Sequence, residues 1–329
     1  MARKKSFFLF LLVLFSVSTF IGASPLSYDF YKTSCPNVEK IIRTVTTQKL
    51  LEAPTTAAGA LRIFFHDCFV DGCDASVLIA SNGSNKAERD AEINLSLPGD
   101  GFEVFFRAKR AVELQCPGVV SCADVMAIAT RDLLNLVGGP RWEVYKGRKD
   151  SLVSNASRIT GNLPLANQTV SQLTSLFKAK GLTVQDMVAL SGGHTIGFSH
   201  CKEFMPRIYA YNKSFDIDPT MDRDFARSLR SPCPENGRLD PSVVALNDVT
   251  TPVKFDNAYF RNLQKGLGLL ATDQLLYTDP STRAYVEAMA KDQSLFFGYF
   301  VAGMVKLGNL GIKTGRSGEI RCDCGFFNG

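Results

Sequence analysis

Histidine is scarce in this chain: His66, His194 and His200 are the only three among its 329 residues. The nine cysteines include no Cys-x-x-Cys pair, which is the usual first half of a structural zinc site. A zinc-binding module is therefore disfavoured, and any chemistry that needs an imidazole has to use one or two of these three histidines.

Strong charge bias and long apolar runs are also missing. Three basic residues, 3–5, precede the apolar run 7–15 and small residues at 22–24. This pattern is typical of a secretory signal peptide, which we predict over residues 1–23. Loss of those three cations lowers the formal net charge from +5 to +2. The nearly balanced charge disfavours a nucleic-acid partner, and the apolar run is too short to span a membrane.

Strand signals are few, whereas apolar residues recur at helical spacing along most of the chain. No internal repeat or low-complexity linker divides it, so we predict a mainly α fold, with a short strand at Trp142–Val144 and loop-rich stretches at 70–100, 145–168 and 211–252. The predicted helices are one with an apolar face on Val38, Ile41, Ile42 and Val45, then 55–69, Phe102–Leu114, a helix capped by Ser121, a helix opened by Thr169, Val184–Leu190, 198–210, Asn257–Gln264, a helix capped by Ser281, and Gln293–Leu307.

Cysteines and sequons fit an oxidising compartment. Behind a signal peptide, eight of the nine cysteines most simply form four disulfides, with one left over. Eight cysteines allow many pairings, so spacing alone leaves the connectivity open. Five Asn-x-Ser/Thr sequons fit a secreted glycoprotein: Asn82, Asn94, Asn155, Asn167 and Asn212.

The segment 61–76, LRIFFHDCFVDGCDAS, concentrates the residues that can carry chemistry. Arg62 and His66 are four apart, which puts both side chains on one face of a helix. The residues after His66 predict a small oxygen-rich loop closed by a short disulfide. The competing interpretation is a helix end with a structural histidine and a solvated acidic loop.

A second candidate is His194, which follows a pair of glycines after a predicted helix. Two single histidines that face each other suit a flat cofactor between them, although a site built on only one of them is the alternative. Asp273 could hold the second ring nitrogen of a ligating histidine. Spacing alone does not distinguish it from a surface aspartate.

Several long motifs resemble those of plant secretory (class III) haem peroxidases, and the resemblance covers nearly the whole chain after residue 23. It implies a haem peroxidase fold over residues 24–329, with very little β-structure and one haem b between two helical lobes. The distal lobe would span about 24–145 and the proximal lobe about 146–329, with the C-terminal end tied back to the distal lobe. The motifs are FFHDCFVDGCDAS with the preceding Arg62, VSCADVMAIATRD, LSGGHTIGFSHC, and Thr251–Asp256 with Asp273.

The resemblance implies a role for each residue on the distal side. His66 matches the histidine that takes a proton from hydrogen peroxide and returns it to the departing oxygen. Arg62 matches the arginine that stabilises the negative charge developing as the O–O bond breaks. Phe65 matches the aromatic residue at the haem edge. Asn94 and Glu88 match a carboxylate–amide relay that orients His66.

On the proximal side, His194 matches the iron ligand and Asp273 its hydrogen-bond partner. Such a partner makes the imidazole a stronger electron donor to the iron. Pro164 matches the residue whose carbonyl meets small phenolic donors. The implied activity is peroxidase: reduction of hydrogen peroxide with one-electron oxidation of phenolic donors, in cell-wall, lignin, defence or oxidative-stress roles.

The resemblance also implies two calcium ions, bound by hard oxygen ligands, and four disulfides. The distal calcium set is Asp67, Val70, Gly72, Asp74, Ser76 and Glu88, with Val70 and Gly72 acting through backbone carbonyls. The proximal set is Thr195, Asp248, Thr251, Lys254 and Asp256, with Lys254 again acting through its carbonyl. The implied disulfides are Cys35–Cys116, Cys68–Cys73, Cys201–Cys233 and Cys122–Cys324.

Some residues depart from the family pattern. Cys322 is extra and stands two residues from Cys324, so Cys122 could pair with either. Glu92, Asn167 and Glu203 stand near positions where some members carry phenylalanines around the donor entrance, which leaves donor preference open. His200 has no matched role and is taken as structural.

Two other functions were weighed against a peroxidase. One is a wall-associated protein that kept the fold and lost turnover, and the other is a hydrolase built on His66 and a carboxylate. The intact sets around His66 and His194 argue against the first, and the second lacks a placed nucleophile. The sequence predicts a monomer in the extracellular space, in the apoplast or cell wall rather than the vacuole.

Overall fold

The computed structural model describes residues 26–235 and 243–329, so the predicted signal peptide lies outside the described part. Helices dominate, as the periodicity predicts. The α-helices are α1 (Val38–Glu52), α2 (Thr56–Val70), α3 (Gly99–Glu113), α4 (Cys122–Leu136), α5 (Val170–Ala179), α6 (Val184–Ser191), α7 (Met205–Ile208), α8 (Arg223–Arg230), α9 (Ala258–Leu263), α10 (Ala271–Thr278), α11 (Pro280–Lys291) and α12 (Gln293–Leu307).

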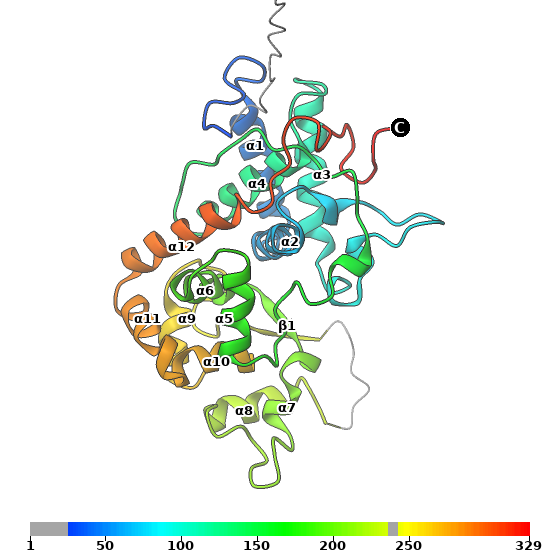
Figure 1. Cartoon of the computed structure of the whole chain (residues 1–329). Helices are drawn as coiled ribbons and strands as arrows, with labels where there is room; N and C mark the ends of the chain where they lie inside the picture. The colour runs from blue at the N-terminus through cyan, green and yellow to red at the C-terminus, as the bar shows by residue number, and fades with distance from the viewer. Residues whose placement is uncertain (1–25, 236–242) are drawn as a thin grey trace, which may run out of the picture.

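The first four helices form one group, at the top of Figure 1. Each of α1, α2 and α3 packs against α4, which is buried along most of its length because its apolar residues cover more than one face. Ser121 begins α4 as predicted, since its hydroxyl accepts a hydrogen bond from the Asp124 N–H. Helix α2 is held between α3 and α4 and carries the motif with Arg62 and His66.

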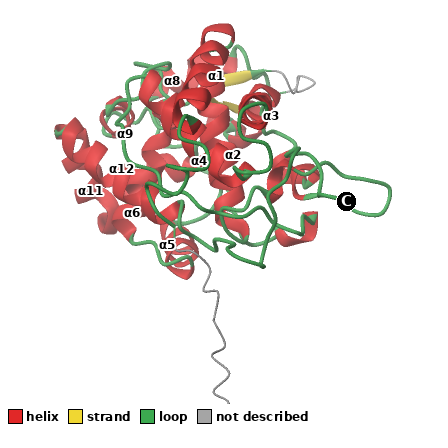
Figure 2. Cartoon of the chain, turned by 90° about the horizontal axis from the view of Figure 1, so that it is seen from above, coloured by secondary structure: helices red, strands yellow, loops and turns green. Residues whose placement is uncertain are grey.

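A second group contains α5, α6, α9, α10 and α11, below the first in Figure 1. A reciprocal capping box begins α5 at Thr169, a predicted helix start. Another begins α6 at Thr183, where the sequence predicts a capping pair with Asp186. Helix α12 packs along α6 and α11 and also touches α2, so it joins the two groups. Figure 2 shows the loops and turns gathered on the side of the molecule that carries the C-terminus.

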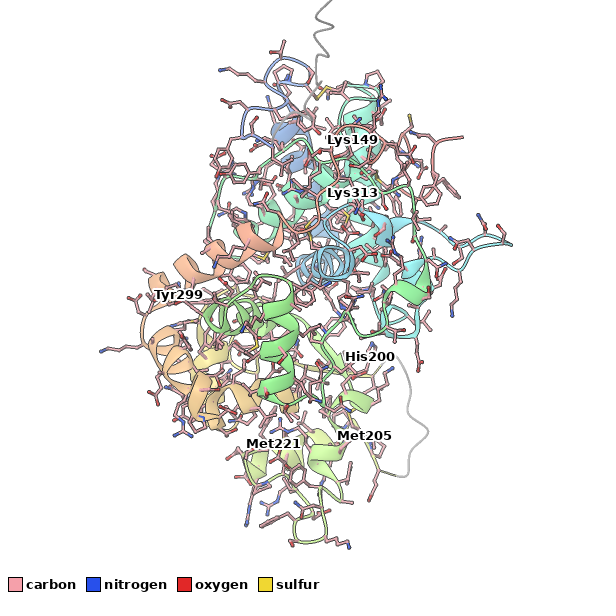
Figure 3. The ribbon with its side chains drawn as sticks, viewed as in Figure 1. Lys149, His200, Met205, Met221, Tyr299 and Lys313 are labelled. Carbon is pink, nitrogen blue, oxygen red and sulfur yellow. A yellow bond between two sulfur atoms is a disulfide. The ribbon has the colours of Figure 1, made fainter. Side chains whose placement is uncertain are left out.

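The segment 198–210 is not the single helix that its composition predicts. Residues 198–200 form strand β1 (Phe198–His200), which pairs antiparallel with β2 (Val244–Leu246) and so leaves the helical path. The 3-10 turn Cys201–Glu203 and the short α7 follow. Figure 3 shows His200 and Met205 on this stretch, with Met221 below them. A small separate apolar cluster forms here around the Cys201–Cys233 disulfide.

Other expectations also need correction. Trp142–Val144 is irregular rather than a strand, and the loop-rich stretch 211–252 contains α8. Helix α10, which carries Asp273, was not predicted. Helix α11 begins at Pro280, where the Asp279 carboxylate rather than Ser281 caps its N-terminus.

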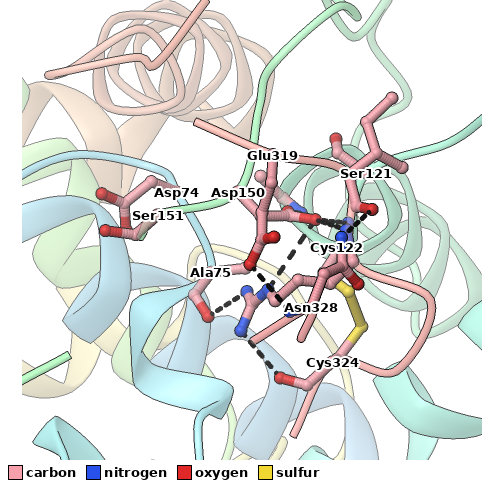
Figure 4. Close-up of polar contacts among 12 residues, drawn as sticks. Asp74, Ala75, Ser121, Cys122, Asp150, Ser151, Glu319, Cys324 and Asn328 are labelled. Atoms are coloured by element: carbon pink, nitrogen blue, oxygen red, sulfur yellow. Dashed lines mark hydrogen bonds and ion pairs between the residues drawn. A yellow bond between two sulfur atoms is a disulfide. The ribbon is translucent and has the colours of Figure 1, made fainter. Parts of the chain in front are cut away.

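The last residues of the chain return to the first group of helices. The Cys122–Cys324 disulfide joins the start of α4 to the tail across 202 residues. The fully buried Arg321 donates to the carbonyls of Ala75 and Cys324, at 2.7 and 2.9 Å. The Asp150 carboxylate accepts from the backbone N–H groups of Arg321 and Cys122, so it caps α4 and holds the tail together (Figure 4).

Candidate active site

Helix α2 places Arg62 and His66 one turn apart, as predicted, with His66 only 7% exposed. The His66 Nδ1 lies 2.7 Å from the Asn94 Oδ1, and the Asn94 amide group donates to the backbone carbonyl of Glu88 at 2.8 Å. An amide oxygen only accepts hydrogen bonds, so His66 carries its proton on Nδ1 and keeps a lone pair on Nε2. Nε2 is thus the nitrogen that can accept a proton from a reactant.

The electrostatics around His66 favour the neutral imidazole. Burial first, and then the positive charge of Arg62, lower the pKa of His66 to about 3, although the hydrogen bond to Asn94 opposes the shift. His66 is therefore unprotonated at neutral pH. A general base needs this state.

The relay behind His66 differs in one respect from the sequence prediction. It runs through the backbone carbonyl of Glu88, whereas the Glu88 carboxylate turns away and accepts a hydrogen bond from the Ser76 hydroxyl at 2.8 Å. Burial raises the pKa of Glu88 to about 7, and its Oε1 has no hydrogen-bond partner. Glu88 thus belongs to the acidic loop rather than to the histidine.

The guanidinium of Arg62 contacts a residue that the sequence analysis did not single out. Its two terminal nitrogens donate to the backbone carbonyl and the hydroxyl of Ser96, at 2.9 and 2.8 Å. Burial lowers the pKa of Arg62, and the charge of Glu203 partly offsets this. Ser96 is the third residue of the sequon that begins at Asn94.

On the other side of the site, His194 follows α6 in a 3-10 turn, Gly192–Thr195. A Cβ on Gly192 would lie 2.5 Å from the ring of Phe296, and one on Gly193 would lie 3.0 Å from Leu61. Glycines are required for this close packing. Since Leu61 precedes Arg62, the contact brings the His194 turn directly against α2.

His194 is held by a carboxylate, as the motifs imply. Its Nδ1 lies 2.8 Å from the Asp273 Oδ1. Burial lowers the pKa of His194, but the charge and hydrogen bond of Asp273 outweigh burial, so the net shift is upward. The Tyr259 hydroxyl also donates to Asp273, at 2.9 Å. The apolar positions around Tyr259 gave no sign of this role.

Both histidines lie near the Arg62 guanidinium. The positive charge of Arg62 lowers the pKa of each of them, which places the guanidinium within electrostatic range of both. The His194 side chain is 42% exposed although its neighbours Gly193 and Thr195 are buried. The structure thus brings the predicted distal and proximal residues to the two sides of one site.

Phe65 stacks on Phe69, with ring centroids 4.6 Å apart, and lies 6.2 Å from the ring of Phe177 in α5. The aromatic side of α2 is thereby joined to the second group of helices. Pro164 is half-buried in the irregular segment before α5. Among the described residues, neither histidine forms a hydrogen bond with it. Its contact with a donor remains a prediction.

The loop after His66 is organised around buried carboxylates. Asp67 accepts hydrogen bonds from the backbone N–H groups of Asp74, Ala75 and Val77, at 2.9–3.2 Å. Burial and the negative charge of Asp74 raise the pKa of Asp67 well above its ordinary value. One oxygen of Asp74 and one of Glu88 are buried without a hydrogen-bond partner. The loop therefore contains more negative charge than its own donors neutralise.

Tight packing shapes the same loop. Cys68 and Cys73 form a disulfide, and Gly72 has a φ of 125°. A Cβ on Gly72 would lie 2.4 Å from the carbonyl oxygen of Gly311, so only glycine fits. The Val70 carbonyl accepts a hydrogen bond from Lys180 at 2.7 Å, a contact that sequence spacing did not indicate.

The residue after His194 leads into the second predicted oxygen cluster. The Thr195 hydroxyl donates to Asp248 at 3.1 Å, and the Thr251 hydroxyl donates to Asp256 at 3.0 Å. The amide of Asn262, which the sequence analysis missed, donates to Asp248 at 2.7 Å. Within residues 26–235 and 243–329, no three His, Cys, Asp or Glu side chains converge as a ready metal site.

The described disulfides join Cys35 to Cys116, Cys68 to Cys73, Cys122 to Cys324 and Cys201 to Cys233. These are the four pairs that the family resemblance implies. Cys122 thus pairs with Cys324, and Cys322 is exposed and unpaired.

Comparison with known proteins identifies the class of protein that this site defines. Residues 41–292 match the family model described as peroxidase, so the chain belongs to the peroxidase family. Among curated relatives from Arabidopsis thaliana, it is 52% identical to Peroxidase 41 over 97% of both chains. It is 51% identical to Peroxidase 31 over the full length of both, and 52% identical to Peroxidase 65 over 92% of this chain and 89% of that one.

These matches confirm the predicted resemblance to plant class III peroxidases and the mainly helical fold. The protein is a peroxidase, an oxidoreductase that uses hydrogen peroxide, and its family uses haem. In the described part of the chain, no helix has both the length and the apolar character needed to cross a bilayer.

Proposed function

We propose that Arg62, His66 and His194 perform the peroxidase reaction around one haem b, with small phenols as electron donors. The observation that supports this proposal is the opposite environment of two histidines that both lie within electrostatic range of Arg62. His66 is a neutral base held by an amide, whereas His194 is an electron-rich imidazole held by a carboxylate.

The residues fit a haem. With Nδ1 bonded to Asp273, the His194 Nε2 is the nitrogen free to ligate iron. The His194 side chain is partly exposed although its neighbours are buried, which leaves the imidazole accessible to a ligand. When bound, haem supplies the redox chemistry of the reaction.

The chain's own residues move the protons. The His66 Nε2 accepts the proton of one hydrogen peroxide oxygen and donates it to the other, which leaves as water. Asn94 keeps Nδ1 protonated during both transfers. Arg62 donates hydrogen bonds to the developing negative charge. Overall, one hydrogen peroxide and two phenols give two waters and two phenoxyl radicals.

Phenolic donors are proposed to meet the site at its edge. Phe65 offers an aromatic face there, and the Pro164 carbonyl is a hydrogen-bond acceptor for a phenol hydroxyl. A panel of phenols that differ in size and charge, assayed on the haem-loaded enzyme, tests this assignment. Equal rates with non-aromatic one-electron donors would contradict it.

The central experiment is haem binding by the purified protein and by His194→Ala. The wild type is expected to show a Soret band and peroxide-dependent oxidation of phenols, and His194→Ala to lose iron ligation. Wild-type haem coordination that survives in His194→Ala would contradict the ligand assignment. Activity without haem would overturn the whole proposal.

We further propose that calcium binds at each oxygen cluster. The distal cation is supported by buried oxygens of Asp74 and Glu88 that accept no hydrogen bond, and by the raised pKa values of Asp67 and Glu88. The Lys313 Nζ lies 3.7 Å from the Asp74 oxygen. A hard divalent ion accepts several carboxylates together with hydroxyl and backbone oxygens. The cluster of Thr195, Asp248, Thr251, Lys254 and Asp256 has the same kinds of donor.

Without the metal, the stability of the folded protein is expected to depend on pH. The pKa of Glu88 is about 7 in the folded protein against an ordinary value of 4.5. Because the folded state then binds more protons than the unfolded state, stability without metal falls as pH rises from 4.5 to 7. The loss is about 3 kcal/mol. Thermal unfolding at several pH values, with a chelator and with added calcium, measures this.

Calcium is expected to remove that loss, because it neutralises the carboxylates that pH ionises. Identical melting curves in chelator and calcium at every pH would contradict the metal assignment. The iron chemistry would be unaffected by that result.

We also propose secretion of a monomeric glycoprotein to the extracellular space. Four of the sequons, Asn82, Asn155, Asn167 and Asn212, are exposed, which supports glycosylation there. Peptide mass spectrometry and size-exclusion chromatography of the protein from a secreting plant host test both points. Retention inside the cells would contradict secretion.

A further inference from the structure

The Arg62 guanidinium has few partners for a buried cation. It offers five N–H donors, yet the hydrogen bonds of the described residues connect it only to Ser96. Among the described residues, no carboxylate accepts a hydrogen bond from the Arg62 guanidinium. Burial lowers the pKa of Arg62. Two oxygens of one residue therefore fix one edge of the guanidinium and leave the remaining donors for a reactant.

Ser96 is itself held in place. Its hydroxyl donates to the Ile93 carbonyl at 3.3 Å while it accepts from Arg62. The Leu97 N–H closes the same turn by donating to the Asn94 carbonyl at 2.9 Å. The hydroxyl that Arg62 contacts thus has a fixed direction.

One short segment therefore orients both distal side chains. Asn94 holds His66, and Ser96, two residues later, holds Arg62. On α2 the two side chains lie four residues apart on one face. The alignment of the base with the charge-stabilising group is set by this turn opposite the helix.

We propose that Ser96 is a positioning residue for the peroxide reaction, through the Arg62 guanidinium. This inference rests on the proposed role of Arg62. The Ser96 hydroxyl holds the guanidinium so that its free donors point at the developing negative charge, and loss of the hydroxyl lets the side chain adopt other rotamers.

The Asn94-Leu95-Ser96 sequon is then part of the active site rather than a glycosylation site. Asn94 is only 2% exposed, and both atoms of its amide are engaged, with His66 and with Glu88. A glycan on Asn94 is incompatible with these bonds. The hydroxyl of this sequon serves Arg62, and Asn94 stays unmodified.

The test compares Ser96→Ala, Ser96→Thr and Ser96→Val in the haem-loaded enzyme. Thr and Val have nearly the same shape, so this pair isolates the hydroxyl. Ser96→Ala and Ser96→Val are expected to slow the reaction with hydrogen peroxide about tenfold, and Ser96→Thr to stay within about threefold of wild type. The KM for the phenolic donor should not change.

A binding measurement supplies the second readout. Fluoride binds at the iron in place of peroxide and accepts a hydrogen bond from a guanidinium above it. Its affinity, followed by absorbance, is expected to fall about tenfold in Ser96→Val and to recover in Ser96→Thr. A merely structural role would lower the melting temperature without this split.

Ser84→Ala is the matched control. It also removes a sequon, at Asn82, but Ser84 lies in an exposed turn and bonds only locally to the Asn82 side chain. Its peroxide rate and fluoride affinity should equal those of wild type. Mass spectrometry of the wild type should find the Asn94 peptide without a glycan.

Comparison of the Ser96 variants with Arg62→Ala distinguishes the role of Ser96 from the role of Arg62. Wild-type rates in Ser96→Val, alongside a slow Arg62→Ala, would overturn the inference and leave the proposed function intact. Wild-type rates in both would remove the role of Arg62 itself. A glycan on Asn94, or equal losses in Ser96→Thr and Ser96→Val, would also overturn the inference.

Discussion

His66 and His194 are the same side chain in opposite settings. The Nδ1 of His66 contacts an uncharged amide, and burial lowers its pKa to about 3. The Nδ1 of His194 contacts the Asp273 carboxylate, which raises its pKa in spite of burial. Burial and the charge of Arg62 thus keep the His66 Nε2 unprotonated, whereas the Asp273 carboxylate makes the His194 imidazole a stronger electron donor.

This contrast explains why the site needs both histidines. A distal histidine with a carboxylate partner would stay protonated and could not accept a proton. A proximal histidine with an amide partner would donate less electron density to the iron. Each prediction below changes one side of this comparison.

The largest effect is expected from removing the distal base. His66→Ala should slow the reaction with hydrogen peroxide by about 10³-fold or more, because no other described side chain replaces the proton acceptor. Haem should remain bound through His194. Stopped-flow kinetics measure the rate, and His200→Ala is the control. A loss of less than about tenfold would contradict the assignment.

The next effect comes from giving His66 the partner that His194 has. Asn94→Asp should raise the pKa of His66, so the protonated form persists to higher pH. Below the new pKa the peroxide rate should fall about tenfold for each pH unit, where wild type stays flat down to about pH 4. Asn82→Asp, an exposed site, is the control. A flat profile in Asn94→Asp would break the comparison.

The reverse exchange acts on the proximal side. Asp273→Asn should cost about 10–100-fold in activity and raise the reduction potential of the iron, because His194 loses its anionic partner. Spectroelectrochemical titration measures the potential. The exposed Asp224 provides the control Asp224→Asn. An unchanged potential would show that the carboxylate does not tune the imidazole.

The smallest effect is expected from Tyr259→Phe. The hydroxyl donates to Asp273, and burial together with that carboxylate raises the Tyr259 pKa well above its ordinary value, so it stays protonated. Its loss removes one hydrogen bond, worth about 1 kcal/mol. The potential should shift in the direction opposite to Asp273→Asn, since the carboxylate regains electron density for His194.

Local sequence patterns predicted the parts of the fold that local physics decides. The caps at Ser121, Thr169 and Thr183 are satisfied within three residues of each helix start. The segment 198–210 was predicted wrongly because pairing with residues 244–246 and the Cys201–Cys233 disulfide act from a distance. Helix α10 has the same length as the predicted α6, but its N-cap position is Leu270, which has no side-chain capping group to mark the helix start.

The site shows the same division. The spacing of Arg62 and His66 and the glycines before His194 mark these three residues, whereas Asp273 was assigned through the family resemblance. Ser96, Tyr259 and Lys180 carry no such mark, since a serine in a sequon, an aromatic residue at helical spacing and a lysine near a helix end are common. Their roles depend on which distant residue folding brings beside them.

The closure of the tail on the first group of helices has a consequence for synthesis. Arg321 and Cys324 are made about 200 residues or more after Ala75 and Cys122, to which they bond. The first group of helices therefore lacks these contacts until residues 321–324 have been made. A chain truncated before residue 321 cannot form the hydrogen bond from Arg321 to Ala75 or the Cys122–Cys324 disulfide. That disulfide closes 202 residues and restricts the unfolded chain by about 5 kcal/mol. Formation of the Cys122–Cys324 disulfide thus reports that the chain has been made as far as Cys324.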